Sequence, residues 1–134
     1  MRIEGVLESC LYVDDLDAAE EFYRRVLGLE VHSREPKRHV FFGCGTGMLL
    51  LFNPDTTLEP SGIVPTHGAH GPGHIAFALP EPEISAWRER LRRHSVEIET
   101  EVSWPNGGHS IYFRDPGGNS VELATPRIWG LAPA

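Results

Sequence analysis

Residues 7–31 read LESCLYVDDLDAAEEFYRRVLGLEV, and this stretch decides the fold. Apolar and polar side chains alternate over 7–13, which is typical of a strand with two chemically different faces. The aspartates 14–15 then offer an N-cap, and apolar residues recur at helical spacing over 16–28, where Gly28 is a typical helix end. The stretch therefore predicts a strand followed by an amphipathic helix.

The second half of the chain repeats this order. Residues 73–79 (GHIAFAL) predict a strand and residues 81–94 a helix, and Glu8 corresponds to His74 at an offset of 66. Three short strands follow each helix, at 30–35, 39–44 and 48–52 and again at 96–102, 109–115 and 119–125. A short unit that recurs along the whole chain indicates two βαβββ modules, each too small to bury its own sheet face alone.

The expected fold class is α+β, with two βαβββ modules that form a curved mixed sheet with a concave cavity in one domain, 1–134. The modules span 1–53 and 73–126, and a C-terminal tail covers 127–134. The segment between the modules, 54–72, is rich in Pro, Gly, Thr and His. That composition fits either a lid or a simple crossover.

Composition excludes several classes of protein. The chain has 134 residues and a formal charge of −7, which suits one acidic domain and disfavours nucleic acid or an anionic membrane as a partner. No apolar run approaches the roughly 20 residues of a membrane span, and the N-terminus lacks a signal-peptide core. Cys10 and Cys44 are too few for a disulfide framework. A soluble cytoplasmic protein is expected.

Strand alternation directs three metal-ligating side chains toward one cavity. Glu8, His74 and Glu122 lie on the inward faces of their strands, because their apolar neighbours belong against the helices. A carboxylate on such a strand is costly to bury without a partner. Two carboxylates and one imidazole would neutralise a divalent metal ion and leave positions open for water or substrate. The alternative is that each is an ordinary, half-exposed strand residue near the rim.

The sequence also resembles a known protein family. The opening stretch resembles the vicinal oxygen chelate superfamily through a specific combination of residues: Val13, Asp15, Leu16, Phe22, Tyr23 and 26–29. Residues 73–79 and 110–126 (SIYFRDPGGNSVELATP) are similar to its second module. The superfamily groups glyoxalase I, fosfomycin-resistance proteins, extradiol dioxygenases, methylmalonyl-CoA epimerase and bleomycin-resistance proteins. The resemblance implies the glyoxalase/bleomycin resistance/dihydroxybiphenyl dioxygenase fold.

The resemblance also implies a metal site. Its metal positions fall on Glu8, His74 and Glu122, and the ion expected is Mn, Fe, Zn or Ni, with a metal-free site as the alternative. The first position is more often His or Gln in the family than Glu. The fourth position falls on Leu51, or on Leu49 of the same face, and neither can ligate. A four-ligand glyoxalase I site is therefore not expected, whereas a three-ligand site is.

Four further side chains are candidate substrate-binding residues. Ser110 and Tyr112 match positions that bind the phosphonate in fosfomycin-resistance enzymes, and Tyr12 and Trp104 would line the cavity; the alternative is that they are ordinary strand and rim residues. Glu122 and Tyr112 are the candidate catalytic residues. Arg127 is the nearest arginine to the family's cationic clamp and is not a secure match, which disfavours fosfomycin itself.

Three other side chains have a less definite role. His67 and His70 of the crossover would add metal ligands or a general base, unless they are simply solvated. Cys10 would touch a ligand, unless it is a buried small hydrophobe.

Two functions follow as hypotheses. The first is a metal-dependent enzyme of the lyase, isomerase or transferase type, less favourably a dioxygenase, that chelates a small oxygenated metabolite or antibiotic through two oxygens. The alternative is a metal-free, bleomycin-resistance-type protein that sequesters a ligand, or a binding domain without catalytic power. The resemblance further implies a homodimer, in which a ligand such as Glu8 comes from the neighbouring chain.

Overall fold

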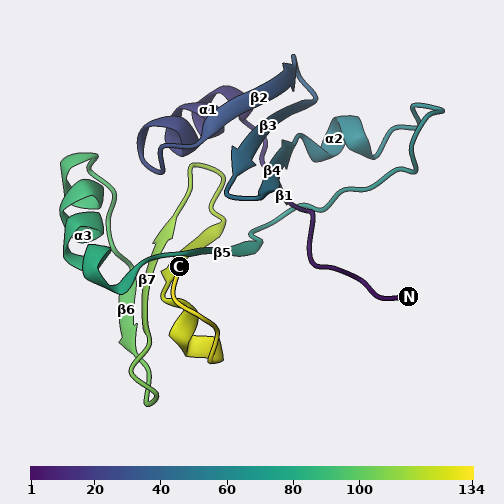
Figure 1. Ribbon diagram of the computed structural model, residues 1–134. Coiled ribbons are helices and arrows are strands. Elements are labelled where there is room, and N and C mark those ends of the chain that lie inside the picture. Colours follow the sequence, from purple (N-terminus) through teal and green to yellow (C-terminus); the bar gives the residue numbers. More distant parts are fainter. The chain divides into compact units, whose positions relative to one another are not determined.

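The computed structural model describes residues 1–134 and divides into two compact units, Met1–Pro72 and Gly73–Ala134. Figure 1 shows that each unit contains strands and at least one helix. Each unit holds one βαβββ module, as the repeat in the sequence predicts.

The first unit is built on a four-stranded mixed sheet. Its elements, in chain order, are β1 (Glu8–Tyr12), α1 (Leu16–Arg25), β2 (Glu30–Glu35), β3 (His39–Cys44), β4 (Gly47–Phe52) and the short α2 (Pro54–Thr57). The strand order is β1-β4-β3-β2. The first strand of the module pairs in parallel with the last, and the other pairs are antiparallel.

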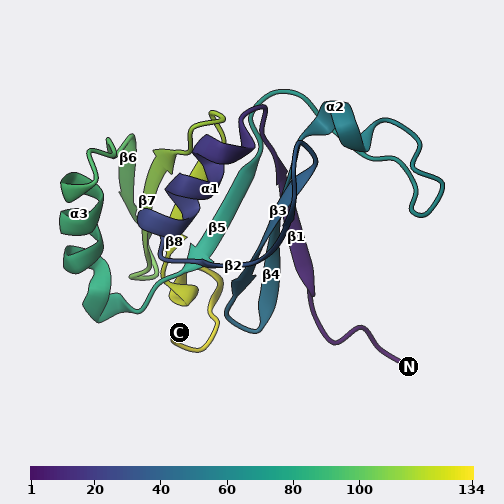
Figure 2. The same cartoon turned by 90° about the horizontal axis from the view of Figure 1, so that it is seen from above.

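The second unit repeats this topology. Its elements are β5 (His74–Ala78), the 3₁₀ turn η1 (Glu81–Glu83), α3 (Ile84–Arg93), β6 (Thr100–Ser103), β7 (His109–Arg114), β8 (Ser120–Ala124) and the 3₁₀ turn η2 (Pro126–Trp129). The strand order β5-β8-β7-β6 again places the first strand parallel to the last. In Figure 2, α3 lies alongside β6 and β7. The α+β fold class and its two βαβββ modules are therefore confirmed.

Helix α1 forms where the sequence places it, with shorter bounds. The Asp15 carboxylate accepts a hydrogen bond from the backbone N–H of Ala18 at 3.0 Å and caps the first turn. The helix ends at Arg25, and Gly28 follows with a φ of 72°, a conformation that favours glycine. Ala19 and Tyr23 are buried, so one face of the helix packs on its own sheet.

The strand register corrects one expectation. Ala76 of β5 lies opposite Glu122 of β8, and at the same place in the first unit Cys10 lies opposite Leu50. Leu50, and neither Leu51 nor Leu49, is therefore the counterpart of Glu122, because Glu122 lies ten positions after its partner Tyr112, whereas Leu50 lies nine positions after its partner Phe41. Leucine at this position cannot ligate either, so the absence of a fourth ligand there is unchanged.

Two other segments differ from the prediction. The strand expected at 96–102 begins only at Thr100. The backbone just before this strand bonds to helix α3 instead of to a neighbouring strand. The N–H of Val96 donates to the carbonyl of Leu91 at the end of α3. Helix α2 and η2 were not predicted, although each begins at a proline, which is favoured in the first turn of a helix.

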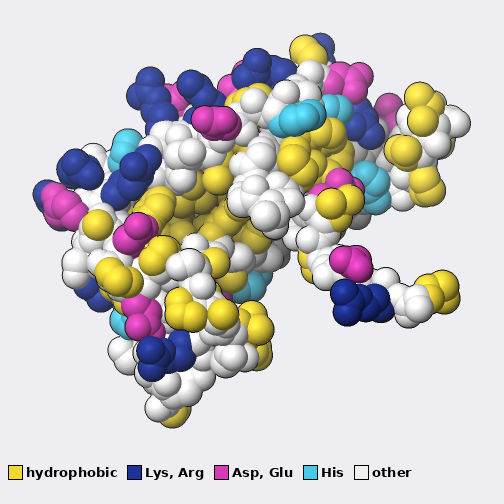
Figure 3. Space-filling model, viewed as in Figure 1, with side chains coloured by type: hydrophobic (Ala, Val, Ile, Leu, Met, Phe, Trp, Pro, Cys, Tyr) yellow, Lys and Arg dark blue, Asp and Glu magenta, His cyan; other side chains and the backbone are white.

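The surface carries mixed charge on the helices. Figure 3 shows basic side chains interspersed with acidic ones on the face in view. Arg25 pairs with Glu21 at 2.8 Å on α1, and Arg92 pairs with Glu89 at 2.6 Å on α3. None of the helices has the length and apolar character needed to cross a lipid bilayer.

A buried polar turn joins β7 to β8. The Asp115 carboxylate accepts hydrogen bonds from the backbone N–H of Asn119 at 2.9 Å and from its side-chain amide at 3.0 Å. The side-chain oxygen of Asn119 in turn accepts from the N–H of Gly73, just before β5, at 2.7 Å. This turn therefore ties the hairpin to the start of β5.

Replacing Asn119 by alanine tests this tie. Asn119 is only 1% exposed, so Asn119→Ala leaves buried partners unsatisfied and should lower the free energy of unfolding by about 1–3 kcal/mol. Urea unfolding measures the loss. The exposed Glu59→Ala should stay within about 0.5 kcal/mol of wild type. Equal stability of both variants would contradict the assignment.

Candidate metal-binding site

The second unit brings His74 and Glu122 into contact. Parallel pairing of β5 with β8 sets His74 opposite Ser120, two residues before Glu122 on the same face. His74 Nε2 and Glu122 Oε1 are 3.2 Å apart. The His74 side chain is half exposed, whereas that of Glu122 is 7% exposed. A buried carboxylate thus faces an accessible imidazole.

The backbone determines which nitrogen of His74 is free. Nδ1 lies 3.0 Å from the carbonyl oxygen of Ser120. A carbonyl oxygen only accepts, so Nδ1 carries a proton and donates a hydrogen bond to this oxygen. In the neutral imidazole, Nε2 then presents its lone pair toward Glu122. A carbonyl that orients a histidine in this way is the usual companion of a metal-ligating imidazole.

The second oxygen of Glu122 is held separately. Ser110 of β7, which is fully buried, donates from Oγ to Glu122 Oε2 at 2.6 Å. The indole N–H of Trp104 donates to Ser110 Oγ at 2.9 Å. Of the two carboxylate oxygens, it is therefore Oε1 that faces His74.

Tyr112 completes this group. It lies opposite Glu122 in the register of β7 with β8, and its ring stacks with that of His74 at 6.3 Å between centroids. Burial, and next the negative charge of Glu122, raise the pKa of Tyr112 above its ordinary value of 10.0, against a smaller opposing contribution from Ser110. The phenol is therefore protonated at neutral pH and able to donate a hydrogen bond.

The geometry of the pair fits a divalent ion. Ligand atoms 2.0–2.2 Å from one metal, at octahedral or tetrahedral angles, lie roughly 2.8–3.6 Å apart. The separation of His74 Nε2 and Glu122 Oε1, 3.2 Å, falls in this range. Without an ion or a second imidazole proton, a lone pair would face a carboxylate oxygen, which is unfavourable. His74 and Glu122 therefore suit a metal.

The other predicted ligand belongs to the first unit. Glu8 opens β1 at the position that His74 occupies in β5, since each lies two residues before the strand position paired with Leu50 or Glu122. Glu8 is exposed. Neither unit gathers three His, Cys, Asp or Glu side chains suited to a metal ion. The second unit thus supplies two of the three predicted ligands.

The corresponding face of the first unit is aromatic. Tyr12 stands among rings that sequence analysis did not single out: His39, Phe41 and Phe52. The alternation of side chains along β3 and β4 could have revealed this aromatic face, because the strand register places these residues on the same face of the sheet as Tyr12. Burial, together with the neighbouring Cys10, raises the pKa of Tyr12 to about 12.

The two crossover histidines differ in their surroundings, since His67 is half-buried and His70 is exposed. His67 Nδ1 lies 2.6 Å from the Tyr12 hydroxyl, and the His67 ring packs edge-on against Phe52. His70 pairs with Asp55 at 3.2 Å. Cys10 also differs from expectation, because it is exposed rather than buried. The Cys10 side chain lies on the same face of β1 as Glu8. Because β1 is an edge strand, it has a neighbouring strand, β4, on one side only.

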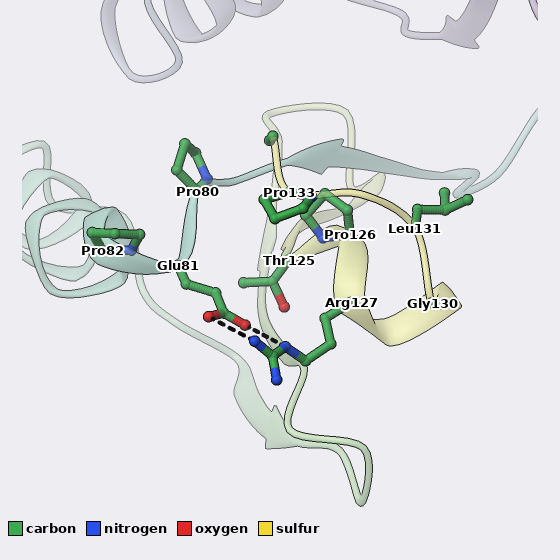
Figure 4. A pocket seen from close by; sticks show the side chains of 10 residues that line it. Pro80, Glu81, Pro82, Thr125, Pro126, Arg127, Gly130, Leu131 and Pro133 are labelled. Carbon is green, nitrogen blue, oxygen red and sulfur yellow. Dashed lines mark hydrogen bonds and ion pairs between the residues drawn. The ribbon is translucent and has the colours of Figure 1, made fainter.

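A separate cavity of about 380 Å³ lies elsewhere in the second unit (Figure 4). Prolines 80, 126 and 133 line it, together with the ion pair between Arg127 and Glu81, whose Nε and Oε1 are 2.8 Å apart. None of the predicted site residues lines this cavity. Because the charge of Arg127 is already paired there, Arg127 is a poor cationic clamp for a substrate anion.

Comparison with known proteins assigns the chain to a family. The model of the Glyoxalase/Bleomycin resistance protein/Dioxygenase superfamily matches residues 5–123. The chain belongs to this superfamily, as the resemblance of its motifs implies.

Individual relatives are consistent with that membership. A lactoylglutathione lyase from Agrobacterium tumefaciens has a solved structure that is 42% identical, with a TM-score of 0.93 over 98% of this chain and 100% of that one. A glyoxalase/bleomycin resistance protein/dioxygenase from Nocardioides is 29% identical, with a TM-score of 0.74 over 93% and 85%. Metallothiol transferase FosB of Staphylococcus epidermidis is 28% identical over 93% of this chain and 84% of its own length.

The aromatic face yields a titration test. Burial, and next the positive charge of Arg38, lower the pKa of His39 below 6.5, although Glu35, 3.9 Å away, opposes this. The contribution of neutral His39 to the free energy of unfolding is fully present above pH 6.5, the ordinary pKa of histidine. It is lost as the pH falls through the lowered pKa of His39 in the folded protein. Arg38→Ala should therefore raise the pKa of His39 in an NMR titration, whereas Arg24→Ala on α1 should not. A wild-type pKa at or above 6.5 would contradict this account.

Proposed function

We propose that the chain is a metal-dependent enzyme of the lyase, isomerase or transferase type that acts on a small oxygenated molecule. The observation that carries the proposal is the 3.2 Å approach of His74 Nε2 to Glu122 Oε1, with the remaining polar atom of each side chain held by a hydrogen bond. Two of the relatives are named as a metallothiol transferase and a lactoylglutathione lyase, which supports chemistry on a thiol or a thiol adduct.

In this proposal Glu8, His74 and Glu122 hold a divalent ion. Two carboxylates and a neutral imidazole balance its charge, and three protein ligands leave coordination positions for a substrate. The donor set of oxygen and nitrogen suits Mn, Fe, Zn or Ni. Because Glu8 lies in the first unit, it would come either from the same chain or from the partner in a homodimer.

The metal would act as a Lewis acid on substrate oxygens. Side chains of the protein bind the substrate and accept its proton. Tyr112, kept protonated by its surroundings, donates a hydrogen bond to a substrate oxygen, and Tyr12 is the proposed substrate-binding residue of the first unit. Glu122 accepts the proton that the substrate releases. Oxygenation is less favoured, because ring-cleaving dioxygenases are expected to use two histidines and one carboxylate.

Metal content tests the site directly. Wild-type protein purified without chelator or nickel-affinity tag should contain close to one divalent ion per chain by mass spectrometry. Glu122→Gln should lose it, because the amide carries no negative charge, whereas Glu97→Gln on an exposed surface should keep it. Metal-free wild type, even after dialysis against Mn, Fe, Zn or Ni, would contradict the proposal. A ligand-sequestering protein would then be the better hypothesis.

Activity tests the reaction type. We expect turnover of a thiol adduct of the lactoylglutathione type to depend on added metal and to stop with chelator. Glu122→Gln and His74→Gln should lower kcat/KM at least about 100-fold, since they remove ligands on which substrate polarisation depends. Full activity of both variants would show that the site lies elsewhere.

A further inference from the structure

We infer that Trp104 and Ser110 are positioning residues for Glu122: they bind one of its oxygens so that the other is presented to the metal. This inference rests on the proposed metal site. It assigns Ser110 and Trp104 a role in aligning a ligand, in place of direct contact with the substrate.

The direction of the hydrogen-bond chain is determined by its outer end. An indole N–H donates only, so Ser110 Oγ must accept from Trp104 at 2.9 Å. The single hydroxyl proton of Ser110 then points to Glu122 Oε2 at 2.6 Å, the short distance typical of a donor to a charged oxygen. The proton of Ser110 is therefore committed to the carboxylate.

The inner part of this hydrogen-bond network is shielded from water, whereas Trp104 at its outer end is exposed. Ser110 is fully buried, and Glu122 is almost so. Inside a site of low dielectric constant, a hydrogen bond to a charged group is stronger than at the surface, and an unpaired carboxylate oxygen costs more. The bond from Ser110 therefore fixes the carboxylate plane and favours coordination through Oε1 alone.

The loop that carries Trp104 is anchored independently of the site. The backbone N–H of Trp104 donates to the carbonyl of Gly108 at 2.8 Å. The side-chain amide of Asn106 donates to the carbonyl of Arg127 at 2.9 Å, which fastens the loop to η2. At Gly108 a Cβ would come within 2.5 Å of the Ile128 side chain, so the loop packs closely there. The indole is thus held in place by its own loop.

The test measures metal affinity, followed as the loss of the free Mn²⁺ signal in an electron paramagnetic resonance titration. Removing such a supporting partner typically weakens metal binding 10–100-fold, so Ser110→Ala should raise the Kd for Mn²⁺ by about that factor. Ser110→Thr keeps the hydroxyl and should restore the Kd to within about threefold. Trp104→Phe removes only the N–H and should raise it by about 3–10-fold.

Matched controls separate positioning from packing. Ser85 of α3 and Trp129 of η2 are exposed and take no part in the hydrogen bonds between Trp104, Ser110 and Glu122. Ser85→Ala and Trp129→Phe should therefore leave the Kd for Mn²⁺ unchanged. A second measurement needs no metal: the indole proton of Trp104 should exchange with solvent more slowly than that of Trp129, and Ser110→Ala should remove the difference. Should Ser110→Ala fail to fold, Trp104→Phe carries the test by itself.

The outcomes are distinguishable. If wild type binds Mn²⁺ and both Ser110→Ala and Trp104→Phe bind it equally well, the positioning role is wrong while the metal site stands. If these variants keep the Kd for Mn²⁺ but raise KM for the substrate, Ser110 contacts substrate instead. If wild type binds no metal under any condition, the proposed function and this inference both fail.

Discussion

The structure depends on the parallel pairing of the first and last strands within each module. This pairing brings β5 beside β8 although their sequences are separated by a helix and two strands. His74 and Glu122 can meet only because that register is kept, since a slip by one residue would turn either side chain to the opposite face. The helix covers the other face of the sheet with apolar residues, so the polar residues share the remaining one.

Burial of one carboxylate then dictates the surroundings of the site. Glu122 lies among the buried residues of β8, where an unpaired charge would be unstable. Ser110 satisfies one oxygen, and His74 stands beside the other. A metal ion would complete this balance of charge. The same contacts that keep the carboxylate folded inside the protein would also align it as a ligand.

The two modules share a topology and differ in chemistry. The face that is polar in the second unit is aromatic in the first, where Leu50 stands in place of Glu122 and Phe41 in place of Tyr112. Phe52 packs there against Tyr12 and the crossover residue His67. The second copy of the repeat therefore brings together the His74–Glu122 pair, whereas the corresponding face of the first is suited to contact an apolar or aromatic group.

The sequence by itself determined the module order, a helix cap at one of the aspartates 14–15 and the inward face of β5 and β8, because these follow from periodicity and local hydrogen bonding. Alternation also identified His74 and Glu122 as neighbours. Only the tertiary structure decided that Leu50 is the counterpart of Glu122, since register depends on loop lengths that the repeat in the sequence leaves ambiguous by one residue. The contacts of Trp104 with Ser110 and of His67 with Tyr12 likewise arise from long-range packing, which no local pattern encodes.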